Sequence, residues 1–181
     1  LEESLLKAIR SLETGKNHIH MEKFDSAHMT VEQLLDYVRE GTDDRLYAIS
    51  QLMWLGVDHS RICDLTQIDM FFLDKIKHIV DFEKELEANP DDPALLREAK
   101  RMGFSDAYIA ELWHTDEDTV YACRCSMDLF PVYHMIDTCA SEFSSYVPYF
   151  YSTYETQNES VVTDRRKILV LGSGPIRIGQ G

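Results

Sequence analysis

Apolar side chains recur at three- and four-residue intervals along much of the chain, and this helical spacing limits its fold more than any other feature. In the first such run, Leu5, Leu6 and Ile9 fall on one helical face. Glycine, proline and capping residues interrupt the pattern repeatedly, so the runs are separate helices. They span residues 1–13, 30–41, 43–56, 58–65, 66–88, 93–102, 105–113 and 115–125. The sequence therefore predicts an all-α bundle of about seven or eight short-to-medium helices.

Residues that favour helix ends support several of these boundaries. Thr30 begins a Thr-x-x-Gln pattern that is typical of a capping box, and Gly41 closes that short helix. Asp92 is placed to cap the helix that starts at Pro93, because proline suits a first helical turn. The longest predicted helix starts near Thr66.

Residues 16–29 have no helical or alternating period and are predicted to form a surface loop. We expect its histidines, His18, His20 and His28, to lie in solvent and not on a metal. The predicted core comes from apolar residues of the helices, namely Trp54, Phe71, Phe72, Ile76, Leu112 and Trp113.

A weak internal repeat relates two parts of the chain. Residues 56–65 align with residues 103–112, with glycine, an apolar residue and a polar cap followed by isoleucine and leucine in register. Two related helix–turn–helix units would suit an all-α bundle. Chance similarity between short helices is the alternative.

The character of the chain changes after Ser126. Residues 126–157 are rich in aromatic side chains and contain two prolines, without a sustained period. An ordered segment of this kind usually packs along another surface, so we predict a long irregular arm. Residues 158–166 read as a linker, and residues 167–171 as a β-strand. In an excised segment, the arm would expose its aromatic side chains: Tyr146, Tyr149, Phe150 and Tyr151.

The net charge of −14, from 18 basic and 32 acidic residues, argues against nucleic acid and anionic membranes as partners. The alternative reading of this acidity is that it keeps a helical protein soluble. No apolar run approaches the roughly 20 residues that span a bilayer. We therefore expect a cytoplasmic protein, with its four cysteines reduced.

Neither metal binding nor nucleophilic catalysis has a convincing set of residues. Cys123 and Cys125 could ligate zinc only with further ligands, and His114 and His134 do not stand at a familiar spacing. Cys139 has His134, Asp137 and Glu142 near it in sequence, and a cysteine–histidine pair can form a reactive thiolate. A packed or interfacial cysteine explains Cys139 equally simply. We predict no metal site and no catalytic residue in this chain.

Residues 104–125 also have the outline of a DNA-reading helix–turn–helix. The second helix would place its first turn in the major groove, and that turn contains Asp116, Glu117 and Asp118. Phosphates would repel these carboxylates, whereas the positive end of a helix dipole favours them. DNA binding is therefore a weak alternative.

The end of the sequence has a glycine-rich loop after the predicted strand. Gly172 and Gly174 resemble the start of a dinucleotide-binding fingerprint, but Arg177 stands where the third glycine belongs. As a phosphate loop, Gly174 and Gly179 have the correct spacing, yet the lysine that should follow is Gln180. We interpret Gly172, Gly174 and Gly179 as an incomplete cofactor-binding loop, and the chain as a segment cut at both ends.

Two closing motifs carry a resemblance to a known family. The runs 131-PVYHMIDTCASEF-143 and 149-YFYSTYE-155, followed by 168-ILVLGSGPIRIGQG-181, closely resemble the large subunit of carbamoyl phosphate synthetase. Upstream, 68-IDMFFLDKI-76 and 102-MGFSDAYIAEL-112 are similar to the helical domain between its two halves.

The resemblance has modest departures and implies a division of the chain. His134 stands where the family commonly has lysine, and Ile136 where it has valine, which puts detailed contacts in doubt. The division it implies has residues 1–14 as the tail helix of a preceding ATP-grasp unit, 15–157 as the helical oligomerisation domain, 158–166 as a linker and 167–181 as the truncated start of the second synthetase half.

The resemblance also implies a function for the parent protein. The large subunit is similar to a pair of fused ATP-grasp synthetases, which use ATP with Mg²⁺ or Mn²⁺ to make carbamoyl phosphate from bicarbonate and glutamine-derived ammonia, for arginine and pyrimidine biosynthesis. The expected partners are the adjoining ATP-grasp units, further copies of the chain and a glutaminase small subunit. By this resemblance the segment supports oligomerisation and is inactive alone. The alternatives are a freestanding nucleotide-binding module and the helix–turn–helix DNA-binding domain.

Overall fold

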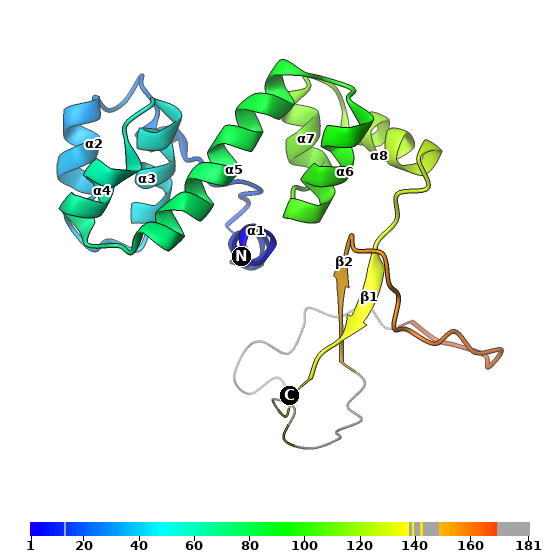
Figure 1. Cartoon of the computed structure of the whole chain (residues 1–181). Coiled ribbons are helices and arrows are strands. Elements are labelled where there is room, and N and C mark those ends of the chain that lie inside the picture. The colour runs from blue at the N-terminus through cyan, green and yellow to red at the C-terminus, as the bar shows by residue number, and fades with distance from the viewer. Residues whose placement is uncertain (13, 138, 140–141, 143–148, 170–181) are drawn as a thin grey trace.

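The computed structural model describes residues 1–12, 14–137, 139, 142 and 149–169, and this part of the chain is mostly helical, as predicted (Figure 1). Its elements are α1 (Glu2–Ser11), η1 (Glu22–Phe24, a 3₁₀ turn), α2 (Val31–Tyr37), α3 (Arg45–Trp54), α4 (His59–Thr66), α5 (Met70–Ala88), α6 (Pro93–Met102), α7 (Asp106–Leu112), α8 (Glu117–Ser126), β1 (Val132–Met135) and β2 (Phe150–Thr153). Among the described residues, no helix is long and apolar enough to span a bilayer.

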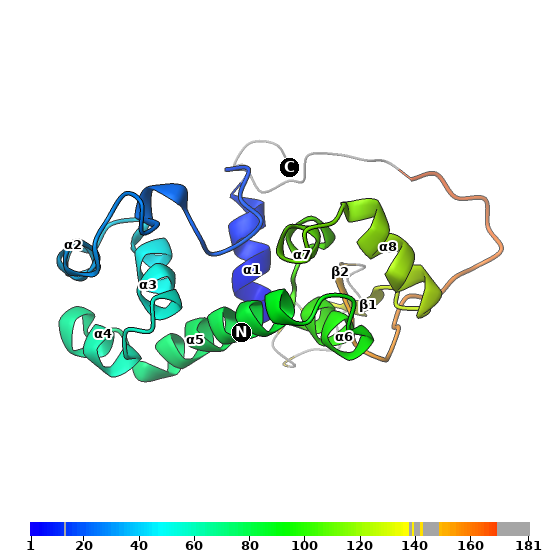
Figure 2. The same ribbon diagram turned by 90° about the horizontal axis from the view of Figure 1, so that it is seen from above.

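Helix α5 forms the axis of the helical body. Helices α2, α3 and α4 gather around its first half, and α6, α7 and α8 around its second half (Figures 1 and 2). Helix α1 contacts both α5 and α6. The buried apolar residues of α5 follow one another at helical spacing: Leu73, Ile76, Ile79, Val80, Phe82 and Leu86. The core of the protein therefore lies along this helix.

The predicted caps at Thr30 and Asp92 are confirmed, whereas two helix ends are corrected: α2 ends at Tyr37, with Val38 as its C-cap, and not at Gly41, and α5 starts later than predicted. The Thr30 side chain accepts a hydrogen bond from the Gln33 amide in a complete capping box. The Asp92 carboxylate accepts hydrogen bonds from the first amides of α6, whose first residue is Pro93. Helix α5 begins at Met70 and not near Thr66, because Gln67 adopts a left-handed conformation that ends α4.

The two repeat-like segments adopt the same local structure. Gly56 and Gly103 both have positive φ angles, of 83° and 92°. In each, the amide after the glycine reaches back to a helix carbonyl at 2.9 Å: Val57 to Leu52, and Phe104 to Ala99. This is a Schellman ending, and a capped helix, α4 or α7, follows it.

Two of the residues predicted for the core are exposed. Phe71 and Phe72 are 56% and 50% exposed, while Ile76 and Trp113 are buried as predicted. The reason is their position on α5. The buried stripe passes through Leu73, and each residue turns a helix by roughly 100°, so both phenylalanines project away from it. Trp54 and Leu112 are packed at the edge of the core and are only partly buried.

The prediction of a surface loop at residues 16–29 is wrong in its central part. Ile19 is fully buried and Phe24 is 1% exposed. The Ile19 carbonyl oxygen accepts a hydrogen bond from the buried Ser50 hydroxyl, and the Phe24 ring packs edge-on against Tyr37 at 5.0 Å. Ile19 and Phe24 are not part of a periodic apolar pattern, so the sequence did not indicate their burial. Their contacts are with residues of other elements.

The aromatic arm contains a small sheet that the sequence did not indicate. Strands β1 and β2 are antiparallel, with Val132 opposite Thr153 and Met135 opposite Phe150. The pair projects from the helical body (Figure 1). Residues 167–169 of the predicted terminal strand are not in a strand, and they have no partner in a sheet ladder; the rest of that strand lies outside the described residues.

The glycine that joins α6 and α7 contacts α1 closely, which yields a stability prediction. A Cβ at Gly103 would lie 2.9 Å from the Glu3 Cα, whereas one at Gly56 would meet nothing within 4 Å. Both glycines are left-handed, so Gly56→Ala reports the backbone cost alone, about 1 kcal/mol. We expect Gly103→Ala to lower the free energy of unfolding by about 3 kcal/mol in urea titrations. Equal losses for the two variants would contradict the close packing of α1.

Candidate functional site

The residues considered for nucleotide or metal binding do not form a site in the described part of the structure. Gly172, Gly174 and Gly179 lie outside the described residues. Cys123 and Cys125 are partly buried in α8. Among the residues that the structure describes, no group of three or more histidine, cysteine or acidic side chains is placed to hold a metal ion.

His134 and the residues near it in sequence have their own contacts. His134 Nε2 lies 3.8 Å from a Glu155 carboxylate oxygen, and its ring lies 5.7 Å from that of Tyr151. The Cys139 amide donates a hydrogen bond to Asp137 at 2.9 Å. His134 therefore belongs to the sheet of the arm.

The first turn of α8 is used for capping. The Asp116 carboxylate accepts hydrogen bonds from the Thr119 amide and hydroxyl at 2.8 and 2.9 Å. Glu117 and Asp118 are exposed beside it. This acidic helix start agrees with a dipole-stabilising role and not with a phosphate-facing one.

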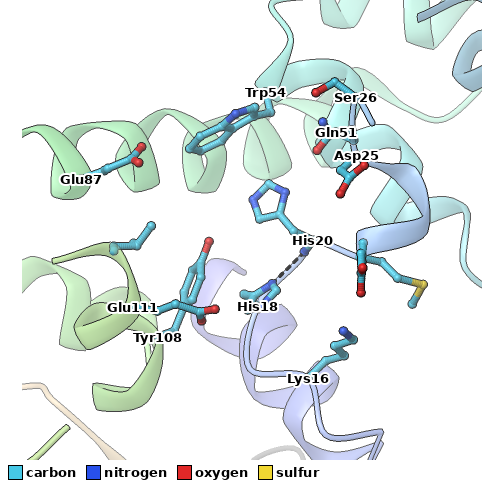
Figure 3. A pocket seen from close by; sticks show the side chains of 13 residues that line it. Lys16, His18, His20, Asp25, Ser26, Gln51, Trp54, Glu87, Tyr108 and Glu111 are labelled. Atoms are coloured by element: carbon cyan, nitrogen blue, oxygen red, sulfur yellow. Dashed lines mark hydrogen bonds between the residues drawn. The ribbon is translucent and has the colours of Figure 1, made fainter. Parts of the chain in front are cut away.

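A cleft of about 530 Å³ lies between α3 and α7, beneath the second half of α5 (Figure 3). We call it the histidine cleft. Its walls come from the loop after α1, from η1, and from helices α3, α5 and α7. They consist of Lys16, His18, His20, Met21, Glu22, Asp25, Ser26, Gln51, Trp54, Glu87, Tyr108, Glu111 and Leu112.

His20 holds a buried carboxylate behind the cleft wall. Its Nε2 lies 2.6 Å from Oε2 of Glu83, whose side chain is fully buried in α5. The other carboxylate oxygen of Glu83 is buried without a hydrogen-bond partner among the described residues. The His20 ring in turn packs edge-on against Trp54 at 5.3 Å. Because a buried carboxylate is costly without a partner, His20 anchors the loop to α5.

His18 forms the opposite wall with Tyr108. The two rings stack with their centroids 4.5 Å apart. Burial, with the nearby His20 and Lys16, lowers the pKa of His18 to about 4, so its ring is neutral at neutral pH. Its Nδ1 then accepts a hydrogen bond from the His20 amide at 3.1 Å. Burial and the charge of Glu83 raise the pKa of Tyr108, which stays protonated.

The sequence contained one signal for this site that its analysis missed. Glu83 falls on the apolar stripe of α5, three residues after Val80 and three before Leu86. A carboxylate at a core position needs a buried partner, and histidine is a common one. The pattern His18-Ile-His20, with an apolar residue between the histidines, was the available candidate.

An ion cluster joins α6, α7 and α8 to the base of the arm. The Asp106 carboxylate accepts hydrogen bonds from Arg124 Nε at 2.9 and 3.0 Å and from Lys100 Nζ at 2.7 Å. Burial would raise the pKa of Asp106, but the hydrogen bonds from Arg124 and Lys100 outweigh it and lower the pKa. The Tyr154 ring lies 5.1 Å from Lys100 Nζ and 5.7 Å from Arg124 Cζ. The cluster therefore fixes the arm where it leaves the helices.

Exposed aromatic side chains gather at two places. Phe71 and Phe72 form an edge-on pair at 5.4 Å at the start of α5. On the arm, the predicted exposure of Tyr149, Phe150 and Tyr151 is confirmed, at 61%, 39% and 43%, whereas Tyr146 lies outside the described residues. Exposed apolar patches of this kind mark surfaces for association.

Comparison with protein families gives one match. The family model described as the carbamoyl-phosphate synthetase large chain, oligomerisation domain, matches residues 1–128. The matched range contains all the helices described above and ends before β1.

The contact between His20 and Glu83 predicts a strong effect of one histidine on stability. His20→Ala leaves the Glu83 carboxylate buried without its partner, and we expect a loss of about 3 kcal/mol in the free energy of unfolding. The matched control is His28→Ala, which removes an exposed histidine that also pairs with a carboxylate, Asp25, and should leave the urea midpoint unchanged. The double variant His20→Ala/Glu83→Met should recover most of the loss. A small effect of His20→Ala would contradict the anchoring role.

The Asp106 cluster predicts a pH-dependent effect. Asp106→Asn removes the charge that pairs Lys100 and Arg124 and should cost about 2 kcal/mol at neutral pH. The folded pKa of Asp106 is lowered, so its contribution is complete above its ordinary value of 3.8 and is lost as the pH falls below that value. Unfolding of both proteins between pH 7 and 2 should therefore show curves that converge at low pH. A constant difference would contradict a charge effect, and Asp36→Asn, in an exposed pair with Arg39, is the control.

Proposed function

The chain belongs to the family of the carbamoyl-phosphate synthetase large-chain oligomerisation domain, and we propose that it is an association and scaffold segment of such a large chain. In this role its helices bind a second copy of the chain and support the neighbouring parts of the same polypeptide. The support for the proposal is the family match together with the exposed aromatic side chains at the start of α5.

We propose that the parent chain is a ligase that makes carbamoyl phosphate from bicarbonate, glutamine-derived ammonia and ATP, in arginine and pyrimidine biosynthesis. In this proposal ATP and Mg²⁺ or Mn²⁺ bind to the adjoining ATP-grasp units, and a glutaminase small subunit supplies the ammonia. The segment itself is proposed to carry no catalytic residue, and the whole complex to act in the cytoplasm.

The exposure of Phe71 and Phe72 is the main structural support for the proposed association. Together the two rings offer an apolar contact that water would otherwise solvate, and aromatic residues are enriched at the centres of protein interfaces. Both stand in the first turn of the longest described helix, so the contact is presented on a rigid element.

A second copy of this chain is the partner that best suits the surface around Phe71 and Phe72. Charges of both signs surround the pair. Lys75 Nζ lies 5.9 Å from the Phe71 ring, and Asp74 pairs with His59 at 3.3 Å. A contact that meets its own copy needs complementary charges on one surface, and a surface of mixed sign avoids the repulsion expected from a net charge of −14.

The arm suits a different partner in this proposal. It is tied to the helical body at Tyr154 by the Asp106 cluster, and to α1 through the Lys7 ammonium, which donates a hydrogen bond to the Ser152 carbonyl oxygen. Its base is thus fixed, while Tyr149, Phe150 and Tyr151 remain exposed. We propose that these side chains pack on a neighbouring unit of the same polypeptide.

Sedimentation equilibrium over a range of concentrations tests the association face. The wild-type mass should rise above that of a 21.0 kDa monomer as concentration increases. The double variant Phe71→Ser/Phe72→Ser should weaken association at least about tenfold, which corresponds to roughly 1.4 kcal/mol. Phe130→Ser is the matched control, because Phe130 is 47% exposed elsewhere on the chain.

The possible outcomes distinguish association through this segment from the assignment of the contact to Phe71 and Phe72. A wild-type chain that is monomeric at every concentration contradicts association through this segment. A wild-type oligomer that the double variant leaves intact contradicts only the assignment of the Phe71–Phe72 face.

A further inference from the structure

The histidine cleft contains a mostly buried polar side chain, Gln51, whose amide opens into the cleft without a hydrogen-bond partner among the described residues. The side chain of Gln51 is only 9% exposed, and it lines the cleft beside Asp25 and Ser26 (Figure 3). Within the described part of the chain, its amide makes no hydrogen bond. Buried amides are normally paired, since an unpaired one loses its hydrogen bonds to water. An amide left open at the wall of a cleft is available to a ligand.

Aromatic rings line the two sides of the same cleft. Trp54 and His20 meet edge-on on the α3 side, and His18 stacks on Tyr108 on the α7 side. These pairs hold the rings in fixed positions. Tyr108 also stacks on Phe104, and the Lys84 ammonium lies 5.2 Å from the centre of the Trp54 ring, so the rings supply apolar contact for the body of a ligand. His18 is neutral at neutral pH and does not oppose a positive ligand.

The charges around the cleft favour the same kind of ligand. Four carboxylates line it, those of Glu22, Asp25, Glu87 and Glu111, against the single ammonium of Lys16. Lys84 is also nearby, but its Nζ donates a hydrogen bond to the Trp54 carbonyl oxygen at 2.8 Å. The cleft therefore attracts cations and repels anions.

We propose that the histidine cleft binds a small organic cation, specifically a primary amine with an apolar or aromatic body. The amine would donate a hydrogen bond to the Gln51 amide oxygen, beside Asp25, while its body packs toward Trp54 and Tyr108 and the Glu87 and Glu111 carboxylates add to the negative field from the opposite wall. A volume of about 530 Å³ is in the range of sites for small molecules. This binding role is independent of association through Phe71 and Phe72.

A matched series of probes tests the proposal on the full chain. Benzylammonium, benzyl alcohol and benzoate have nearly the same shape and differ in charge. Titrations at low salt would follow the Gln51 side-chain amide and the Trp54 indole in ¹H–¹⁵N spectra, with the indole of Trp113 as an internal reference, since Trp113 bonds to the Leu86 carbonyl oxygen away from the cleft lining. We expect saturable shifts with benzylammonium, binding weaker by at least about fivefold with benzyl alcohol, and none with benzoate.

Variants then assign the binding to named groups. Glu87→Gln/Glu111→Gln changes two exposed side chains and should weaken benzylammonium about two- to tenfold. The control is Glu85→Gln, which neutralises an exposed carboxylate of α5 that does not line the cleft and should have no effect. Gln51→Met should weaken binding by a similar factor, with circular dichroism to verify its fold.

Two results would overturn the proposal. One is the absence of saturable shifts at Gln51 and Trp54 with benzylammonium. The other is equal affinity for the three probes, or an equal loss in Glu85→Gln and Glu87→Gln/Glu111→Gln, because either would mean that charge in the cleft does not select the ligand. Both readouts are independent of the mass measurements that test association.

Discussion

The apolar stripe of α5 is the constraint on which the rest of the structure depends. The helix has 19 residues, and its buried side chains extend from Leu73 to Leu86. A stripe of this length is covered by two groups of helices, one at each half. Because the stripe runs through Glu83, folding also carries a carboxylate into the interior. His20 provides its hydrogen bond, and the loop before α2 is thereby drawn against the core.

The division of the body along α5 also separates its proposed roles. The first turn of α5 extends past the buried stripe and leaves Phe71 and Phe72 in solvent, where a second copy can contact them. The two helix groups meet further along, and the space between α3 and α7 is the histidine cleft. One helix thus presents an apolar contact at its start and forms part of an acidic, aromatic cleft near its end.

The arm is joined to this body by electrostatic contacts and cation–π contacts. Asp106 pairs with two cations, Lys100 and Arg124, which also lie 5.1 and 5.7 Å from the Tyr154 ring. The two cations also donate hydrogen bonds to the carbonyl oxygens of Phe104 and Leu129, and this fully hydrogen-bonded cluster is specific for one arrangement of α6, α7, α8 and the arm. Further along the described part of the arm, the Lys7 ammonium contacts Ser152, and Tyr149, Phe150 and Tyr151 are exposed.

The sequence by itself determined the helices and most of their ends. The bonds that define them are local: Thr30 caps an amide three residues away, and Gly103 ends α6 through its own backbone angles. The family could be inferred as well, because its motifs are continuous runs of residues. Tertiary structure alone decided that Phe71 is exposed, that Ile19 is buried, that β1 pairs with β2, and that His20 meets Glu83, 63 residues away. Each of these features depends on contacts between distant segments. The periodicity of one segment does not indicate which other segment will pack against it.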